Sequence, residues 1–236
     1  TDSKITTIGY YCNPIQYAEH RKTLENVICT AGKFGATHVS TFAGAWEGKP
    51  VESAYEEFGK VFRELADLAE EKGVKLGIEN CLMDGTWEHA TCNIGFNPKA
   101  WEVMFEEVKN DNFGLEWEPT HQMVQLIDPV TELRKWCKKI VHIHGKDATI
   151  DWDAVRHSGI SGAVPFVWHR MPGFGDTNWR DIISILRSNG YEDDICIEGY
   201  HDPVYSGELE MTGQLHALNY LKWCRGGDFT QTPWEK

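Results

Sequence analysis

The chain lacks any run of about 18 apolar residues, so no transmembrane helix is expected. It opens without the pattern of a secretory signal. No glycine-rich phosphate loop follows a strand-like run, which disfavours a nucleotide-binding protein of Rossmann type. No internal repeat, low-complexity segment or linker divides the 236 residues, so we expect one domain over residues 1–236.

Basic residues are scarce relative to acidic ones. The chain has 23 Lys and Arg against 36 Asp and Glu, a formal net charge of −13. No cluster of Lys or Arg stands out, and an acidic surface repels phosphate backbones. We therefore expect no nucleic-acid partner and no membrane partner.

The seven cysteines show no C-x-x-C pair, and their number is odd and their spacing scattered. This usage excludes a disulfide framework and a zinc knot. It is typical of reduced thiols, and we expect a cytoplasmic protein.

The chain does contain short apolar runs that alternate with amphipathic segments. Strand-like runs lie near residues 5–11, 37–43, 74–80, 113–118, 140–146 and 194–199. Helix patterns follow Pro50, Asn97-Pro98, Asp128-Pro129 and Asp176-Thr177, where Asn or Asp can cap and Pro fits the first turn. This alternation, with no hairpin signal, predicts a parallel sheet, either an open doubly wound sheet or a (β/α)8 barrel.

Polar residues gather at the carboxyl ends of several of these runs, which favours the TIM barrel. Only six strands are evident, and a barrel needs eight. Residues 163–168 are apolar, but Pro165 and the following Pro-Gly-x-Gly sequence predict a long loop there. We therefore expect a (β/α)8 barrel that lacks about two N-terminal βα units in this chain.

Period-two spacing defines a candidate metal site. Two strand-like runs direct Glu118 and His144 to one side, and two further runs each end in a single glutamate, Glu79 and Glu198. Three carboxylates and one imidazole form an oxygen-rich set suited to Mn²⁺, Mg²⁺ or Co²⁺. Each acid alone is as readily a surface or ion-paired residue, but the coincidence of all four at strand ends weakens that alternative.

A second layer follows from the same spacing. Glu116 lies one inward step below Glu118, and His142 lies one step below His144. If the strands are neighbours, Glu116 and His142 can pair beneath the metal and orient its ligands. A simple buried ion pair is an equal alternative.

Five further residues are candidates for substrate binding. His121 follows the Glu118 strand and can touch the metal or a substrate hydroxyl, and Lys146 can hold a substrate oxygen or pair with a neighbouring acid. His169 and Arg170 precede the Pro-Gly-x-Gly loop and can close over the site. Trp46 can form a wall against a sugar, although core packing is the commoner role of tryptophan.

Taken together in order, seven segments carry a resemblance. They are Gly77-Ile78-Glu79-Asn80, Asn93-Ile94-Gly95-Phe96-Asn97-Pro98, Glu118-Pro119-Thr120-His121, Ile127-Asp128-Pro129-Val130, His142-Ile143-His144-Gly145-Lys146-Asp147, Arg170-Met171-Pro172-Gly173-Phe174-Gly175 with Trp179, and Ile197-Glu198. With them the chain resembles the xylose isomerase-like TIM-barrel superfamily, in particular its sugar phosphate isomerase/epimerase branch.

The resemblance implies that Glu79, Glu118, His144 and Glu198 hold one divalent metal, Mn²⁺ ahead of Mg²⁺, Co²⁺ or Zn²⁺. It implies that Glu79 and Glu198 act as acid and base beside a carbonyl, and that His121 and Lys146 bind substrate. Two features depart from the family. Glu118 stands where aspartate is usual, which moves the carboxylate by about 1.5 Å, and two strands are missing at the start.

The expected function is a divalent-metal-dependent isomerase or epimerase of a sugar, keto-sugar or cyclitol, acting through an enediolate on a small carbohydrate. A lyase on 3-oxo-glycosides, of the C-glycoside deglycosidase type with a small partner subunit, is the second reading, and a homo-oligomer is also open. The related endonuclease branch with three zinc ions is disfavoured by the −13 charge and by the lack of an Asp-x-His pair between Lys146 and Glu198. An inactive or truncated barrel remnant is the last alternative.

Overall fold

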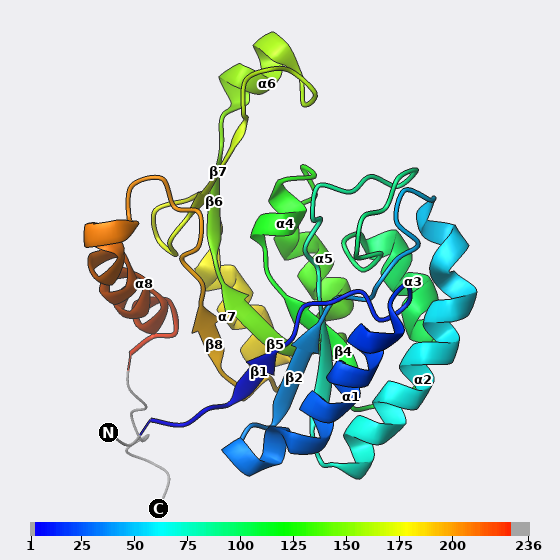
Figure 1. The fold of residues 1–236 in the computed structure, drawn as a ribbon. Helices are drawn as coiled ribbons and strands as arrows, with labels where there is room; N and C mark the ends of the chain where they lie inside the picture. The colour runs from blue at the N-terminus through cyan, green and yellow to red at the C-terminus, as the bar shows by residue number, and fades with distance from the viewer. Residues whose placement is uncertain (1–2, 228–236) are drawn as a thin grey trace, which may run out of the picture.

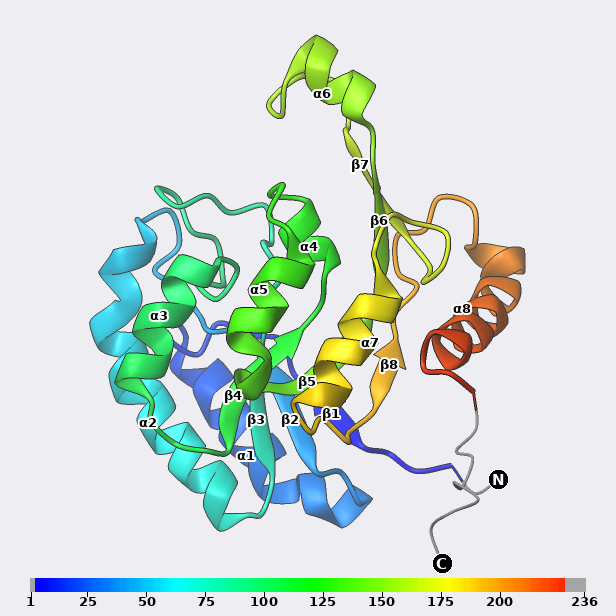
Figure 2. The same cartoon turned by 180° about the vertical axis from the view of Figure 1, so that it is seen from behind.

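The computed structural model describes residues 3–227, which form a curled six-stranded parallel sheet with helices on its outer side (Figures 1 and 2). The strands are β1 (Thr7–Gly9), β2 (His38–Thr41), β3 (Lys75–Glu79), β4 (Phe113–Trp117), β5 (Ile140–Gly145) and β8 (Ile195–Ile197), paired in that order. Each lies inside a predicted run, and the prediction of a partial TIM barrel is confirmed. The predicted single domain over 1–236 stays a prediction, and residues 1, 2 and 228–236 lie outside the described range.

The sequence predicted helices after four positions, and two of these helices begin at their predicted capping residue. The helices are α1 (Ala18–Ala31), α2 (Tyr55–Glu71), α3 (Pro98–Glu107), α4 (Thr120–Met123), α5 (Pro129–Trp136), α6 (Trp152–Ser158), α7 (Trp179–Ser188) and α8 (Glu210–Cys224). Short 3-10 turns cover Gly32–Phe34, Val51–Ala54, Cys137–Lys139 and Gly207–Leu209. Asn97 and Asp128 cap α3 and α5 through their side chains, whereas α7 is capped by Asn178 rather than by the predicted Asp176-Thr177.

The apolar core lies between the sheet and its outer helices. Phe58 and Phe62 of α2 stack at a centroid distance of 4.6 Å and both contact the ring of Phe113 on β4. These side chains are fully buried or nearly so. Burial of aromatic surface on this side holds the sheet in place, and its inner side is left free for the polar residues of the site.

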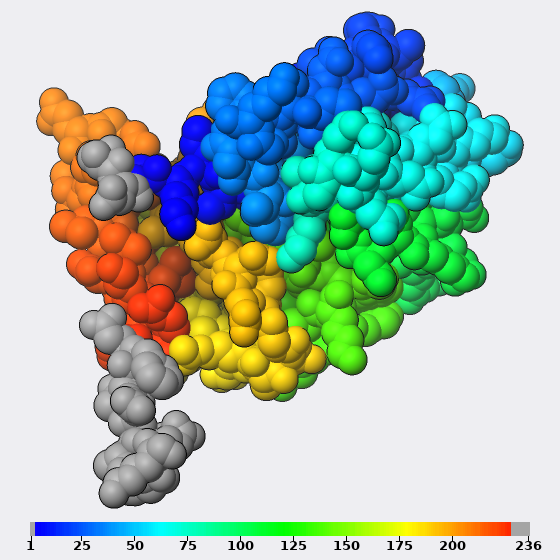
Figure 3. Space-filling view, turned by 90° about the horizontal axis from the view of Figure 1, so that it is seen from below, coloured from blue at the N-terminus to red at the C-terminus, as the bar shows by residue number. Residues whose placement is uncertain are grey.

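The sheet does not close within the described residues, because β1 and β8 each have a hydrogen-bonded neighbour on one side only. A cavity of about 680 Å³ is lined by residues of α7, β8 and α8. The segments coloured for α7 and α8 lie next to each other on the face that Figure 3 shows. The outer face of α8 exposes Met211, Leu215 and Trp223. Within the described residues, β1 and β8 therefore each leave one sheet edge unpaired.

The main sheet is parallel, as predicted, but the prediction of a long loop around residues 163–168 is wrong. β6 (Asp147–Ile150) and β7 (Val167–Arg170) pair antiparallel, and with α6 they form an arm beyond the carboxyl ends of the sheet strands (Figure 1). Pro165 precedes β7 and so removes no hydrogen bond from the pair. An apolar run after a proline was thus compatible with a strand.

Two findings bear on the composition arguments. No helix within residues 3–227 is long and apolar enough to cross a membrane. All seven cysteines are free thiols.

Candidate metal centre

The carboxyl ends of four strands bring four side chains together, which we call the upper cluster: Glu79, Glu118, His144 and Glu198. Glu79 is the last residue of β3, His144 lies in β5, and the other two follow directly on β4 and β8. One donor atom from each lies within 4.8 Å of the others. The structure therefore brings together the four residues that the sequence selected.

Backbone contacts beside the cluster fix where the side chains start. Asn80 accepts a hydrogen bond from the Glu118 amide at 2.8 Å and donates to the Glu118 carbonyl at 2.9 Å. The Glu198 amide donates to the Gly145 carbonyl at 3.0 Å, which continues the pairing of β8 with β5 beyond the strand end. These hydrogen bonds fix the backbone of Glu118 and of Glu198, the two residues that lie just beyond their strands.

The imidazole of His144 faces all three carboxylates. Its Nδ1 lies 3.1 Å from Glu79 Oε1, 3.2 Å from Glu198 Oε2 and 3.6 Å from Glu118 Oε2. Within the described residues, His144 Nδ1, Glu198 Oε2 and Glu118 Oε2 are buried without a hydrogen-bond partner, while Glu118 Oε1 faces His121 and Lys146. Orphaned buried donor atoms of this kind, two of them carboxylate oxygens, fit a divalent cation.

The charges of the upper cluster depend on burial and on one another. Burial opposes ionisation of Glu118, but His121 and Lys146 outweigh it and hold the pKa of Glu118 well below its usual value. Burial also raises the pKa of Glu79, with partial relief from His144. Burial lowers the pKa of His144, but the three carboxylates of the upper cluster and that of Glu116 outweigh it, so the pKa is raised. The same carboxylates that favour a proton on His144 would also attract a metal cation.

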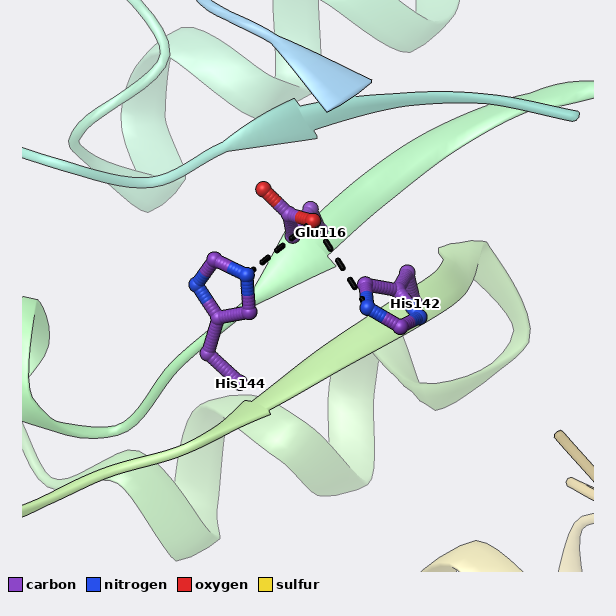
Figure 4. A group of neighbouring side chains, drawn as sticks. All are labelled: Glu116, His142 and His144. Carbon is purple, nitrogen blue, oxygen red and sulfur yellow. Dashed lines mark ion pairs between the residues drawn. The ribbon is translucent and has the colours of Figure 1, made fainter. Parts of the chain in front are cut away.

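A lower cluster lies one layer deeper and consists of Glu116, His142 and His144 (Figure 4). Glu116 and His142 are register partners on β4 and β5, so the predicted pairing is geometrically available. Yet Glu116 Oε1 lies 3.3 Å from His144 Nε2 and 3.8 Å from His142 Nε2. The carboxylate is therefore nearer to the imidazole of the upper cluster than to its predicted partner.

Two cationic side chains join the upper cluster from its rim. His121 Nε2 lies 2.9 Å from Glu118 Oε1, and Glu118 raises the pKa of His121 to about 10 against the opposing effect of burial. Lys146 Nζ donates to Glu198 Oε1 at 2.9 Å and lies 3.7 Å from Glu118 Oε1. Of the two alternatives for Lys146, pairing with a neighbouring acid is realised in this structure.

The other three rim candidates lie in different surroundings. His169 lies beside His121 with a centroid distance of 6.0 Å, and its Nδ1 is buried without a hydrogen-bond partner. Arg170 is instead turned to Asp202, with Nε 3.3 Å from Oδ2. Trp46 lies half-buried in the loop after β2 and packs against the apolar core. Substrate roles for all three remain predictions.

Sequence reasoning missed three residues that support the site. Asn80 clamps Glu118, as described above, and Tyr11 donates its hydroxyl hydrogen to Glu116 Oε2 at 2.8 Å. Asp147 accepts hydrogen bonds from the amides of Gly173 at 3.0 Å and Thr177 at 2.9 Å, and so anchors the loop after β7. Asn80 and Asp147 each adjoin a predicted site residue, which was a usable signal, whereas nothing local marked Tyr11.

Comparison with known proteins assigns the family. A family model described as xylose isomerase-like TIM barrel matches residues 2–222. The chain therefore belongs to this family, and the predicted resemblance is confirmed.

Individual relatives are distant. An inosose dehydratase of Clostridium tetani is 26% identical over 182 residues, which are 75% of this chain and 57% of that protein. The chain thus spans little more than half the length of that relative.

Two solved structures share the fold. The IolI protein with a bound zinc atom has a TM-score of 0.68 at 20% identity, covering 97% of this chain and 77% of that one. A 3-keto-D-glucoside 4-epimerase of E. coli has a TM-score of 0.67 at 14% identity, covering 94% and 80%.

Proposed function

We propose that this protein is a divalent-metal-dependent enzyme that moves a proton next to the carbonyl of a keto-sugar or cyclitol, with isomerisation or epimerisation as the outcome. The observation that carries the proposal is the upper cluster, where buried donor atoms of Glu118, His144 and Glu198 converge without hydrogen-bond partners. Relatives named for sugar epimerisation and inosose dehydration support a carbonyl-bearing carbohydrate as substrate.

The residues that would hold the ion are Glu79, Glu118, His144 and Glu198. When bound, a divalent ion supplies positive charge that polarises the substrate carbonyl. Oxygen-rich donors favour Mn²⁺, with Mg²⁺, Co²⁺ and Zn²⁺ as the other candidates. The IolI structure, which shares this fold, holds a zinc atom, and this supports metal binding by the chain.

Glu79 and Glu198 are the proposed acid and base. The side chain of Glu198 is 28% exposed and that of Glu79 is 9% exposed, so the two carboxylates differ in their contact with solvent. Lys146 orients Glu198 through its 2.9 Å hydrogen bond, while burial raises the pKa of Glu79 toward the range in which a carboxyl group can donate a proton. One carboxylate removes the proton and the other returns it.

Supporting residues hold these groups in place. In this proposal Glu116 accepts a hydrogen bond from His144 Nε2 and so directs His144 Nδ1 toward the ion. His142 lies on the other side of the Glu116 carboxylate. His121 and Lys146 keep Glu118 ionised, and they can also bind a substrate oxygen.

Elimination is the second candidate outcome, because the C. tetani relative is named a dehydratase. Removal of the same proton followed by loss of a leaving group gives a lyase. Lyase action on a 3-oxo-glycoside, with a small partner subunit, belongs to this candidate. The two outcomes share the base and the metal, and they differ in the fate of the carbanion.

The test is solvent exchange. The Mn²⁺-loaded protein is incubated in D2O with a panel of keto-sugars and inososes, and deuterium incorporation is followed by NMR. Exchange is expected with at least one compound, and Glu79→Gln and Glu198→Gln should each slow it about 10²–10⁴-fold. The control is Glu106→Gln, an exposed residue that pairs with Lys109 on the surface and should exchange like wild type.

Product analysis separates the outcomes. An isomer of unchanged mass supports isomerisation or epimerisation, and loss of water or of an aglycone supports elimination. Absence of exchange with every compound contradicts both. Absence of any bound divalent metal would support the inactive remnant.

A further inference from the structure

The lower cluster has the composition of a metal site in its own right. Glu116 supplies one carboxylate oxygen, and His142 and His144 each direct Nε2 toward it (Figure 4). The three donor atoms lie within 4.8 Å of one another, at 3.3 and 3.8 Å from the carboxylate oxygen. Donors around a tetrahedral ion with bonds of about 2.1 Å lie about 3.4 Å apart, so the spacing suits one ion.

The surrounding contacts leave room for an ion between these donor atoms. Tyr11 occupies Glu116 Oε2, while Glu116 Oε1 is buried and has no close hydrogen bond within residues 3–227, its nearest donor being His144 Nε2 at 3.3 Å. Glu116 is 0% exposed, so water does not solvate this charge. Thr7 Oγ1 lies 3.4 Å from His142 Nδ1, which leaves Nε2 of that ring directed at the carboxylate from beyond hydrogen-bond distance.

We infer that the lower cluster binds a second divalent cation, of the zinc type, beneath the ion of the upper cluster. Two imidazoles and one carboxylate are a donor set that Zn²⁺ and Co²⁺ accept readily, whereas the oxygen-rich upper cluster suits Mn²⁺ or Mg²⁺. His144 serves both sites, because its Nδ1 faces the upper carboxylates and its Nε2 faces Glu116. With the upper ion on Nδ1, the second ion would take the place of the proton on Nε2; His144 would then be an imidazolate that bridges the two ions, and the proton would pass to solvent.

The inference goes beyond the proposed reaction, and metal stoichiometry tests it without any substrate. Protein stripped with EDTA is titrated with Zn²⁺, and bound ions are counted by native mass spectrometry. Two equivalents are expected for wild type and one for His142→Ala, because His142 belongs to the lower cluster only. Co²⁺ gives a second readout, since a lower-cluster ion with two imidazoles should add the intense visible absorption of four-coordinate cobalt, absent from His142→Ala.

The control is His38→Ala. His38 is a buried histidine whose ring packs against His142 at 5.6 Å but supplies no atom to the lower cluster. It should bind two equivalents. Glu198→Gln should weaken only the upper ion, because its carboxylate belongs to the upper cluster alone.

The outcomes separate the two proposals. One equivalent in wild type that Glu198→Gln weakens overturns the second site and leaves the proposed function standing. Two equivalents in His142→Ala likewise overturn it. No bound ion in wild type overturns both. If His142→Ala does not fold, the wild-type count and Glu198→Gln together decide the question.

Discussion

The upper and lower clusters share His144 and lie one layer apart, yet burial affects the charge of their side chains differently. In the upper cluster, His121 and Lys146 keep the carboxylate of Glu118 ionised despite complete burial. In the lower cluster, burial outweighs the attraction of Glu116 and lowers the pKa of His142 to about 4, so that this imidazole is neutral. The upper layer is built from three anions that need a cation, whereas the lower layer sets one neutral nitrogen donor, His142, beside a single carboxylate, Glu116.

This difference shows that residues two apart on the same strands, which face the same side, can form two sites with different donor atoms. Barrel interiors are ordinarily filled by branched apolar side chains, whereas here Glu116 occupies that layer. Gly77 on the neighbouring strand makes the space, because a Cβ there would lie 3.2 Å from the Glu116 amide nitrogen and 3.3 Å from its Cβ. The polar interior therefore depends on a small residue on the adjacent strand as well as on the glutamate itself.

Glu118→Gln should give the largest effect, because it removes the charge from the centre of the upper cluster. We expect the affinity for Mn²⁺, measured by calorimetry, to fall by more than the 10–100-fold that is typical of losing an outer partner of a metal ligand. The pKa of His121, raised to about 10 by Glu118, should fall in the same variant, which NMR titration of the imidazole can follow.

A graded variant controls for this prediction. Glu118→Asp keeps the charge but shortens the side chain by about 1.5 Å. The carboxylate then moves away from His121, whose Nε2 lies 2.9 Å from Oε1 in the wild-type protein. Its Mn²⁺ affinity should lie between those of wild type and Glu118→Gln. Equal affinities of all three proteins would show that Glu118 does not hold the ion.

Glu116→Gln should have the second largest effect, because it acts on the upper ion through His144. We expect Mn²⁺ affinity to fall about 10–100-fold, since the neutral amide no longer fixes the imidazole with Nδ1 toward the ion. Zn²⁺ stoichiometry should fall at the same time if the lower cluster binds an ion. An unchanged Mn²⁺ affinity would contradict the positioning role of Glu116.

His142 should make the ion-free protein less stable in acid. Its pKa of about 4 lies below the unfolded value of about 6.5, so the unfolded chain binds the extra proton as the pH falls. Between pH 7 and pH 5 this one group should remove about 2 kcal/mol of unfolding free energy. Urea unfolding in EDTA at both pH values, with His142→Phe as the comparison, measures it. Equal losses in the two proteins would contradict the low pKa.

Much of the two clusters was predictable because strand periodicity is local. Glu79, Glu118, His144 and Glu198 follow from runs that end in polar residues, and the parallel order of the strands brings those ends together. The register of Glu116 beside His142 was foreseen for the same reason. Its closer approach to His144 was not, because that depends on side-chain torsions across two strands.

The parts that failed depend on contacts distant in sequence. The arm was missed because Pro165 and the Pro-Gly-x-Gly sequence obscured the pairing of β7 with β6. The substrate role of Arg170 stays a prediction, but its contact with the buried carboxylate of Asp202, 32 residues away, was not foreseen. Tyr11 and Glu116 are 105 residues apart in the sequence, and no local pattern predicts their hydrogen bond.

Tyr11→Phe should have the smallest effect, because it removes a hydrogen bond and keeps the ring. The hydroxyl donates to Glu116 Oε2 at 2.8 Å, and Tyr11 is 41% exposed, so we expect a loss of about 1 kcal/mol of unfolding free energy in the ion-free protein. Mn²⁺ affinity should fall less than tenfold, because Glu116 keeps its charge and its approach to His144. Tyr10→Phe is the matched control, since its ring packs edge-to-face on His20, away from both clusters. If the two variants lose the same stability and affinity, the Tyr11 hydroxyl does not orient Glu116, and the lower cluster is held by packing alone.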